Sequence, residues 1–205
     1  SGGLSIPTLG GSGIGYEIAK QFGHHVYPTR AGLVPFTFSD HFKEVTTRLS
    51  GNAVEATLSN PFNSFTEALL FTHRGLSGPS SLQLSNYWHS GQAFQIDFLP
   101  SLDLHAFFKT KKTAQPKVLL RTLLNEHLPK SVVLELQNLI WLEHADTAIG
   151  NLSDDKLEAI ATQLHGFEVK PSGTEGYRTA EVTLGGVNTE EVSSKTMESK
   201  KQKGL

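Results

Sequence analysis

Apolar and polar residues alternate strictly in two segments of the chain. In residues 52–58, Val54, Ala56 and Leu58 fall on one face, and residues 92–98 alternate in the same way. A period of two is typical of a strand with one buried face. Weaker β character recurs in residues 33–38, 67–72, 167–170 and 179–184. The chain therefore contains several short strands separated by turn residues.

Between residues 102 and 165 the apolar period changes to that of helices. One stripe consists of Leu119, Leu120, Leu123 and Leu124, a second of Val132, Leu136, Leu139 and Ile140, and a third of Leu157, Ile160, Ala161 and Leu164. Ser153 is a natural N-cap for the third helix, and Gly166 follows its end. A further short helix is expected over residues 16–22, closed by Gly23.

Strands that flank a block of helices predict an α+β fold. The simplest arrangement is a small antiparallel β-barrel with a helical subdomain inserted into it, although a sandwich fits the same pattern. Residues 193–203 are polar and rich in lysine, a composition typical of a disordered tail.

The amino-acid composition excludes several kinds of site but does not identify the function. The 205 residues carry a formal net charge of −2 and no cysteine. The chain therefore has no disulfide, no reactive thiolate and no cysteine-ligated metal, which fits a reducing cytoplasm. No apolar run approaches the roughly 20 residues that a membrane helix needs. We expect a domain of a larger protein, because glycine-rich segments lie near both ends.

The glycine-rich start resembles a nucleotide-binding loop only superficially. Gly11, Gly13 and Gly15 form G-x-G-x-G, and no reading frame gives the G-x-G-x-x-G of dinucleotide sites. Pro7 also interrupts any preceding strand. A glycine-rich turn beside a cofactor that other segments hold fits the residues better than a complete site.

Histidines offer one candidate for chemistry. None of the nine has the spacing of a known zinc motif, so no metal site is predicted. His73 is the most suggestive, because Gly75 and Gly78 fix a tight turn next to it and to Arg74. The turn is interpreted either as a strand-to-helix corner or as a contact for an anionic ligand. Ser77 lacks the G-x-S-x-G context of a hydrolase nucleophile.

A basic cluster near the start of the helical block has two interpretations. It consists of Lys109, Lys111, Lys112, Lys117 and Arg121, just after Phe107 and Phe108. Basic residues interleaved with aromatic residues can hold RNA. A solvated helix end explains the same pattern.

Four segments together resemble one family. They are Gly2-Gly3-Leu4-Ser5-Ile6-Pro7 with Gly10 to Tyr16 and Gly23-His24, then Leu33-Val34-Pro35, then Thr72-His73-Arg74-Gly75-Leu76-Ser77-Gly78-Pro79, and finally Val182-Thr183-Leu184-Gly185-Gly186-Val187 with Thr196-Met197-Glu198-Ser199-Lys200 and Gly204-Leu205. These segments are similar to the BaiN/YhiN-like NAD(P)/FAD-dependent flavoproteins. The match runs in order along nearly the whole chain.

The resemblance implies an FAD domain that is split around a long insert. It divides the chain into residues 1–30 as a flanking segment of the FAD domain, 31–100 as the first part of the barrel, 101–165 as the helical subdomain, 166–187 as the last part of the barrel, and 188–205 as the return linker. Gly2 and Gly3 are then expected at the edge of the FAD, and Thr183, Gly185 and Gly186 toward its ring. Most other FAD contacts are expected outside this chain.

The implied function is the substrate side of an FAD-dependent oxidoreductase, inactive as an isolated domain. NAD(P)H is the implied reductant, and His73 the candidate catalytic acid. The resemblance leaves two substrate classes open, since family members reduce steroid-like bile acid enones or form dihydrouridine in ribosomal RNA. The expected partner is the rest of its own FAD-binding domain, in the cytoplasm and without a membrane. The alternative is a non-catalytic module that docks a macromolecule such as structured RNA.

Overall fold

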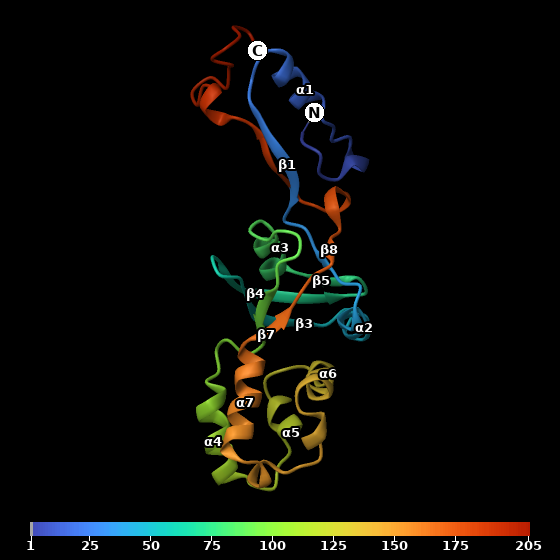
Figure 1. The fold of residues 1–205 in the computed structure, drawn as a ribbon, viewed down its shortest axis with the longest axis vertical. Helices are drawn as coiled ribbons and strands as arrows, with labels where there is room; N and C mark the ends of the chain where they lie inside the picture. The colour runs from blue at the N-terminus through green and yellow to red at the C-terminus, as the bar shows by residue number, and fades with distance from the viewer. Residues whose placement is uncertain (1) are drawn as a thin grey trace. The chain divides into compact units, whose positions relative to one another are not determined.

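The computed structural model describes residues 2–205, which form two compact units (Figure 1). One unit contains the chain up to Pro35 together with Thr174–Leu205, and the other is Phe36–Gly173. Helices and antiparallel strand pairs occur together, so the predicted α+β class is confirmed. Within residues 2–205, no helix combines the length and the apolar character needed to cross a membrane.

The unit Phe36–Gly173 is built on a sheet with the strand order β7–β6–β3–β4–β5–β2–β8. The strands are β2 (Phe36–Thr37), β3 (Ala53–Ser59), β4 (Ser64–Thr72), β5 (Gly75–Ser77), β6 (Phe94–Asp97), β7 (Phe167–Val169) and β8 (Gly173–Thr174). The interrupted strand expected over residues 33–38 is only the two-residue β2. The other predicted strands of this unit are confirmed to within a few residues.

Strand β3 sets the register of this sheet. It pairs antiparallel with β4 from Ala53–Leu70 to Ser59–Ser64, and its other edge pairs with β6. Val54, Ala56 and Leu58 are buried, as the alternation predicts. Because side chains alternate across a strand, this register also turns Leu69 and Phe71 of β4 and Phe94 and Ile96 of β6 toward the same core.

Two short helices pack on this sheet, and neither is predicted by the pattern of the sequence. Helix α2 (His41–Arg48) begins at Asp40, whose carboxylate accepts a hydrogen bond from the amide of Phe42 at 3.0 Å. Helix α3 (Pro79–Ser85) buries mainly serines, and the hydroxyl of Ser81 donates to the carbonyl of Leu76. Satisfied serines can be buried at little cost, so α3 needs no apolar stripe that a sequence pattern would reveal.

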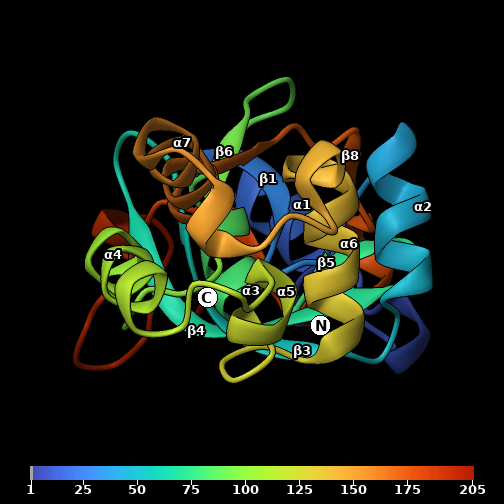
Figure 2. The same cartoon turned by 90° about the horizontal axis from the view of Figure 1, so that it is seen from below.

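The predicted helical block is confirmed between β6 and β7. It consists of α4 (Leu104–Ala114), α5 (Leu120–Leu124), α6 (Lys130–Ile140) and α7 (Asp154–His165), with 3-10 turns η2 (Leu142–His144) and η3 (Ile149–Asn151). Ser153 caps α7 as predicted, since its hydroxyl accepts from the amide of Lys156 at 3.3 Å. Helices α4 and α7 lie side by side (Figures 1 and 2).

An ion pair joins the helical block to α2. The guanidinium of Arg48 donates to both carboxylate oxygens of Glu135 on α6, at 2.6 and 2.8 Å. Figure 2 shows α2 next to α6 on the same side of the unit. Glu135 is 8% exposed, and this two-pronged pairing compensates its charge in a nearly buried position.

The other unit contains a two-stranded antiparallel ribbon of β1 (Val26–Gly32) and β9 (Val182–Val187). Its remaining elements are η1 (Pro7–Leu9), α1 (Ile14–Gln21), η4 (Gly176–Arg178) and η5 (Thr189–Glu191). Helix α1 matches the expected helix, whereas β1 was not predicted. Pro28 lies where the β1–β9 register shifts between Tyr27 and Arg30. A proline is tolerated there because the ladder is already interrupted.

The lysine-rich end of the chain is not the disordered tail that its composition predicts. The amide of Ser193 donates to the carbonyl of Glu198 at 2.8 Å, and Val192 forms a bridge with Ser199. The side chain of Lys201 pairs with Glu191 at 2.7 Å. Composition alone misses this order because contacts that support it come from Gly23 and His24, after α1, and from η5.

Candidate functional site

Thr183 connects strand β9 to the glycine-rich start of the chain. Its hydroxyl oxygen accepts a hydrogen bond from the amide of Leu4 at 2.9 Å and lies 3.0 Å from the hydroxyl of Ser5. A Cβ atom at Gly3 would stand 2.8 Å from the same oxygen and 3.1 Å from the hydroxyl of Tyr16. Glycine is therefore required at position 3 by the chain's own packing.

The two glycines of β9 are explained in the same way. Gly185 has φ +81°, and a Cβ there would overlap the carbonyl oxygen of Pro28 on the facing strand. Gly186 has φ +105°, and a Cβ there would stand 3.2 Å from the ring of Tyr16. Both positions combine a left-handed backbone with a close neighbour, which only glycine accommodates without strain.

The predicted cofactor residues thus fall into two groups. Gly3, Thr183 and Gly186 come together around Tyr16, and Gly185 packs on β1. Among the five predicted residues, only Gly2 is exposed with nothing within 4 Å of an added Cβ. Of these five positions, Gly2 is therefore the one with open space for a group held by another part of the protein.

A cavity of about 480 Å³ lies in the same unit. Tyr16, Lys20 and Tyr27 contribute to its lining. The sequence places Tyr16 in a glycine-rich motif without indicating a role for it. Its position between Gly3 and Gly186 shows that it is the side chain on which the glycine segments pack.

A hydrogen-bonded relay lies at the far end of this unit. The Nδ1 atom of His24 is 3.0 Å from a carboxylate oxygen of Glu191, and its Nε2 is 2.6 Å from the hydroxyl of Ser199. The carboxylate can only accept, so Nδ1–H donates to it, and in the neutral ring Nε2 then accepts from the hydroxyl. Lys201 donates to Glu191 and, with the backbone amide of His25 and the His24 ring, holds the pKa of that carboxyl below its usual range.

This relay has the residue types of a Ser–His–Glu hydrolase triad, but Ser199 is bound as a structural group. Its oxygen accepts hydrogen bonds from the amides of Lys201 and Gln202, at 3.1 and 2.9 Å. Those amides occupy the lone pairs that a nucleophile would use. We refer to His24, Glu191 and Ser199 as the histidine clamp, because they fasten the end of α1 to the last segment of the chain.

His73 lies in a β-hairpin turn. The strand-to-helix corner, one of the two interpretations of this segment, is therefore wrong. Residues 73 and 74 join β4 to β5, and the hydroxyl of Thr72 accepts from the amide of Gly75 at 3.2 Å. The carbonyl of His73 accepts from the hydroxyl of Thr47 on α2. The His73 ring is exposed. His73 belongs to the unit Phe36–Gly173, whereas the five predicted cofactor residues belong to the other unit.

The basic cluster of the helical block is largely paired. Lys112 lies 2.6 Å from Asp154, Arg121 lies 3.0 Å from Asp146, and Lys111 lies 3.4 Å from Glu126. Lys112 holds the pKa of the Asp154 carboxyl below its usual range. Cations that are already compensated attract phosphate less, so these pairs favour the interpretation as a solvated helix end.

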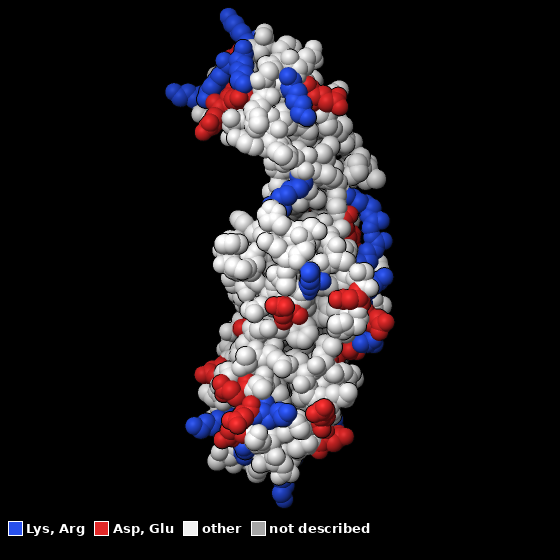
Figure 3. Space-filling model, in the orientation of Figure 1, with Lys and Arg blue, Asp and Glu red and all other residues white. Residues whose placement is uncertain are grey.

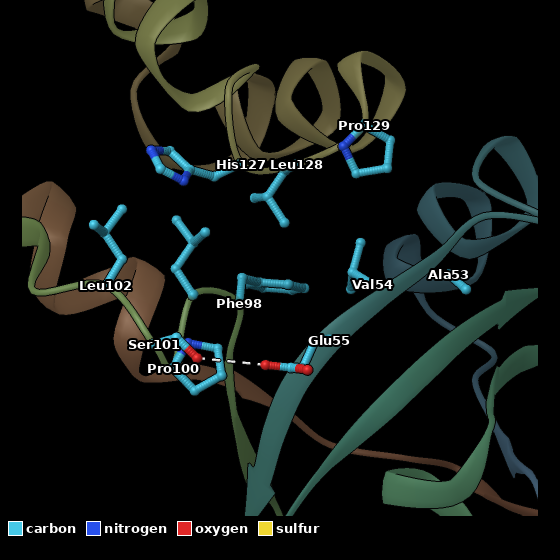
Figure 4. A pocket seen from close by; sticks show the side chains of 11 residues that line it. Ala53, Val54, Glu55, Phe98, Pro100, Ser101, Leu102, His127, Leu128 and Pro129 are labelled. Atoms are coloured by element: carbon cyan, nitrogen blue, oxygen red, sulfur yellow. Dashed lines mark hydrogen bonds between the residues drawn. The ribbon is translucent and has the colours of Figure 1, made fainter.

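A second cavity, of about 440 Å³, lies between β3 and the helical block (Figure 4). Val54, Phe98, Leu102 and Leu128 supply apolar walls. Glu55 and Ser101 lie together at one end, joined by a 3.4 Å hydrogen bond, and His127 lies at the other. Apolar walls with few polar groups are typical of small-ligand sites. In residues 2–205 no three histidine or acidic side chains are arranged to hold a metal ion.

Comparison with known proteins places this architecture in a family. The family model described as "HI0933-like protein barrel and H2TH domain" matches residues 30–182, well over half of the chain. The chain belongs to this HI0933-like family. Its description names a barrel together with a helical domain, in agreement with a sheet that carries α4 to α7 between β6 and β7.

Named relatives of the HI0933-like chain include two synthases and a reductase. It is 48% identical over its whole length to the ribosomal RNA dihydrouridine synthase of Escherichia coli strain K12, and 45% identical to that of Haemophilus influenzae. It is 26% identical to a 3-dehydro-bile acid delta(4,6)-reductase of Clostridium scindens. The chain spans about half the length of these relatives, 51 to 52%. The resemblance inferred from the sequence is confirmed at the level of the family.

Proposed function

We propose that this chain is the substrate-side part of a flavin-dependent reductase that converts uridine to dihydrouridine in ribosomal RNA. The observation that carries the proposal is the 48% identity, over the full 205 residues, to a ribosomal RNA dihydrouridine synthase. The remaining half of such a protein supplies the flavin domain. An RNA substrate of this kind also implies a cytoplasmic enzyme.

The names of the relatives share one type of chemistry. The C5=C6 bond of uracil is conjugated to the C4 carbonyl, and the double bonds of a 3-oxo-delta(4,6) steroid are conjugated to its ketone. In both cases a hydride adds to a carbon of the conjugated system that is remote from the carbonyl. A proton then adds to another carbon of that system, either next to the carbonyl or further along the dienol that the hydride addition forms. In the full-length protein the hydride would come from a bound FAD that NAD(P)H has reduced.

The chain's own residues would position the substrate and exclude water. The cavity bounded by Phe98 and Leu128 gives the unit Phe36–Gly173 an apolar wall, and Gly2 has the open space that an adjoining cofactor needs. His73 remains the proposed proton donor, since its exposed ring is free to approach a bound substrate. The glycine and Thr183 contacts hold the two flanking segments together, so they support the site indirectly.

The test compares the 205-residue chain with the full-length product of its gene. The full-length protein is expected to purify yellow with stoichiometric FAD, and to oxidise NAD(P)H in the presence of ribosomal RNA that lacks the modification. Mass spectrometry of nucleosides should show uridine gaining two hydrogens. The 205-residue chain should bind no FAD. A colourless full-length protein that still binds RNA would reject the reductase and favour a docking module.

A variant tests the role given to His73. His73→Gln should lower kcat for uridine reduction by about 10²- to 10⁴-fold, the contribution of a general acid, while FAD content stays unchanged. His41, the first residue of α2 and also exposed, is the matched control. An unchanged rate for His73→Gln would remove it from the proton transfer.

A further inference from the structure

The tip of the β3–β4 hairpin holds a phenylalanine in solvent. Phe62 lies between the two strands in the loop of residues 60–63 and is 82% exposed. The side-chain oxygen of Asn60 accepts from the amides of Phe62 and Asn63, at 3.0 and 2.9 Å. The amide of Asn60 also donates to the carbonyl of Asn63. The loop is therefore held in one conformation while it displays a large apolar ring.

Two more aromatic side chains adjoin this loop. The Nδ2 of Asn60 donates to the carbonyl of Tyr87 at 3.0 Å. The ring of Tyr87, 49% exposed, stacks on Phe65 of β4, with centroids 5.7 Å apart and planes 23° apart. Asn60 thus ties the loop of Phe62 to the loop that carries Tyr87. We call Phe62, Phe65 and Tyr87 the aromatic platform.

The platform lies in a stretch of sequence with little positive charge. Arg74 is the one lysine or arginine between Arg48 and Lys109. In Figure 3 the edge that projects on the left of this unit carries no charged side chain in that view. Figure 1 shows the β3–β4 hairpin extending on that side. Phosphate groups would gain little here, so a nucleic acid would contact this surface through its bases.

We propose that the aromatic platform stacks against unpaired bases of the RNA substrate. The inference rests on the proposed function, which supplies RNA as the partner. Bases in a duplex cover one another's faces, whereas bases in loops and bulges are free to stack on aromatic side chains. A loop backbone that is fixed in advance loses little conformational entropy on binding, which suits the loop of Phe62 to this role.

Stacking predicts a distinctive response to salt. Each base stacked on an aromatic ring contributes enough that its loss weakens binding by about tenfold or more. Stacking releases no counterions, so the slope of log Kd against log salt should not change when a ring is removed. A phosphate contact would alter both the affinity and the slope.

The experiment measures RNA binding by fluorescence anisotropy with the full-length protein. The probes are a hairpin RNA with an unpaired loop and a blunt duplex with the sequence of its stem. Phe62→Ala and Tyr87→Ala should each weaken hairpin binding about tenfold, leave duplex binding and the salt slope unchanged, and keep the FAD content of the parent. Phe62→Trp should restore affinity. Leu142→Ala, at a leucine that is 60% exposed, is the matched control and should change nothing.

Several outcomes would contradict the proposal that the aromatic platform stacks on unpaired bases. Hairpin affinity that is unchanged in Phe62→Ala and Tyr87→Ala is one, and a changed salt slope is another. Unchanged RNA affinity with a lower mass by light scattering would assign the surface to a second copy of the protein. The proposed function is tested separately, by dihydrouridine formation in the unaltered protein. A protein that binds RNA loops through Phe62 but does not reduce uridine would support the aromatic platform and contradict the proposed reductase.

Discussion

The Nε2 atom of His24 lies 2.6 Å from the hydroxyl oxygen of Ser199, a residue 175 positions further along the chain. His24 is 6% exposed, so its two ring nitrogens depend on protein partners for their hydrogen bonds. Glu191 satisfies one nitrogen and Ser199 the other. The histidine clamp therefore joins the two flanking segments of this unit through a single buried ring.

Removal of the clamp should destabilise this unit. His24→Ala leaves Glu191 and Ser199 without their shared partner, and we expect the free energy of unfolding to fall by about 1–3 kcal/mol. Urea unfolding followed by circular dichroism measures the change. His25→Ala is the control, because the contact of His25 with Glu191 uses its backbone amide and survives the substitution. Equal losses in the two variants would show that the clamp has no special role.

The clamp should weaken in acid. The folded-state pKa of Glu191 lies below the ordinary value of 4.5, chiefly because Lys201 donates to it. Its stabilising contribution is therefore fully present above pH 4.5 and is lost as the pH falls through the folded pKa. Hydrogen exchange of residues 193–203 should accelerate in that window, beyond the intrinsic dependence on pH. In Glu191→Gln exchange should already be fast at neutral pH and show no such step. An identical step in both proteins would assign it to another group.

The β2–β5 pairing should not tolerate a side chain at Gly75. Its φ is +154°, and a Cβ there would overlap the carbonyl oxygen of Phe36 and approach the ring of Phe38 to 2.9 Å. Gly75→Ala should cost about 3 kcal/mol or more, because the obstacle is backbone. Gly51 also has a positive φ, of +91°, but nothing lies within 4 Å of an added Cβ, so Gly51→Ala should cost only about 1–2 kcal/mol. Thermal unfolding of both variants separates steric overlap from backbone strain, and comparable Tm losses would contradict the overlap.

The sequence predicts the parts of this fold that depend on periodicity. The alternation through Val54, Ala56 and Leu58 identifies β3, and Ser153 with its following stripe identifies α7, because one buried face is enough to define each element. Periodicity does not predict helix α3, because the helix buries hydroxyl groups that donate hydrogen bonds to the carbonyls of Ala68 and Leu76. Strand β1 is not predicted either, because Pro28 lies at a shift in the β1–β9 register that is visible only once the partner strand is known.

The candidate site is predictable only in part for a related reason. The motifs contained Gly3, Thr183, His24 and Ser199, but pairing Gly3 with Thr183 and His24 with Ser199 requires the three-dimensional path of the chain. A single sequence reports which residues are unusual. It does not report which distant segment makes them so: the neighbours that a Cβ would meet at Gly3, Gly185 and Gly186 are Thr183, Tyr16 and Pro28.

Gly2 and Gly3 should therefore respond differently to substitution. Gly3→Ala forces a Cβ against Thr183 and Tyr16, so it should destabilise the protein whether or not FAD is bound. At Gly2, φ is +53° and an added Cβ meets nothing within 4 Å. Asparagine tolerates this conformation, so Gly2→Asn should leave the stability of the 205-residue chain nearly unchanged.

The full-length protein then shows whether a cofactor fills that space. If FAD adjoins Gly2, the Gly2→Asn protein should purify with less FAD and release it at least about tenfold more readily, as expected when a well-packed contact is obstructed. Gly10→Asn is the matched control, because Gly10 lies in the same segment with φ +88° and equally open space. FAD content that is normal in both variants would place the cofactor away from Gly2, and equal losses in both would indicate strain in the segment and no direct contact.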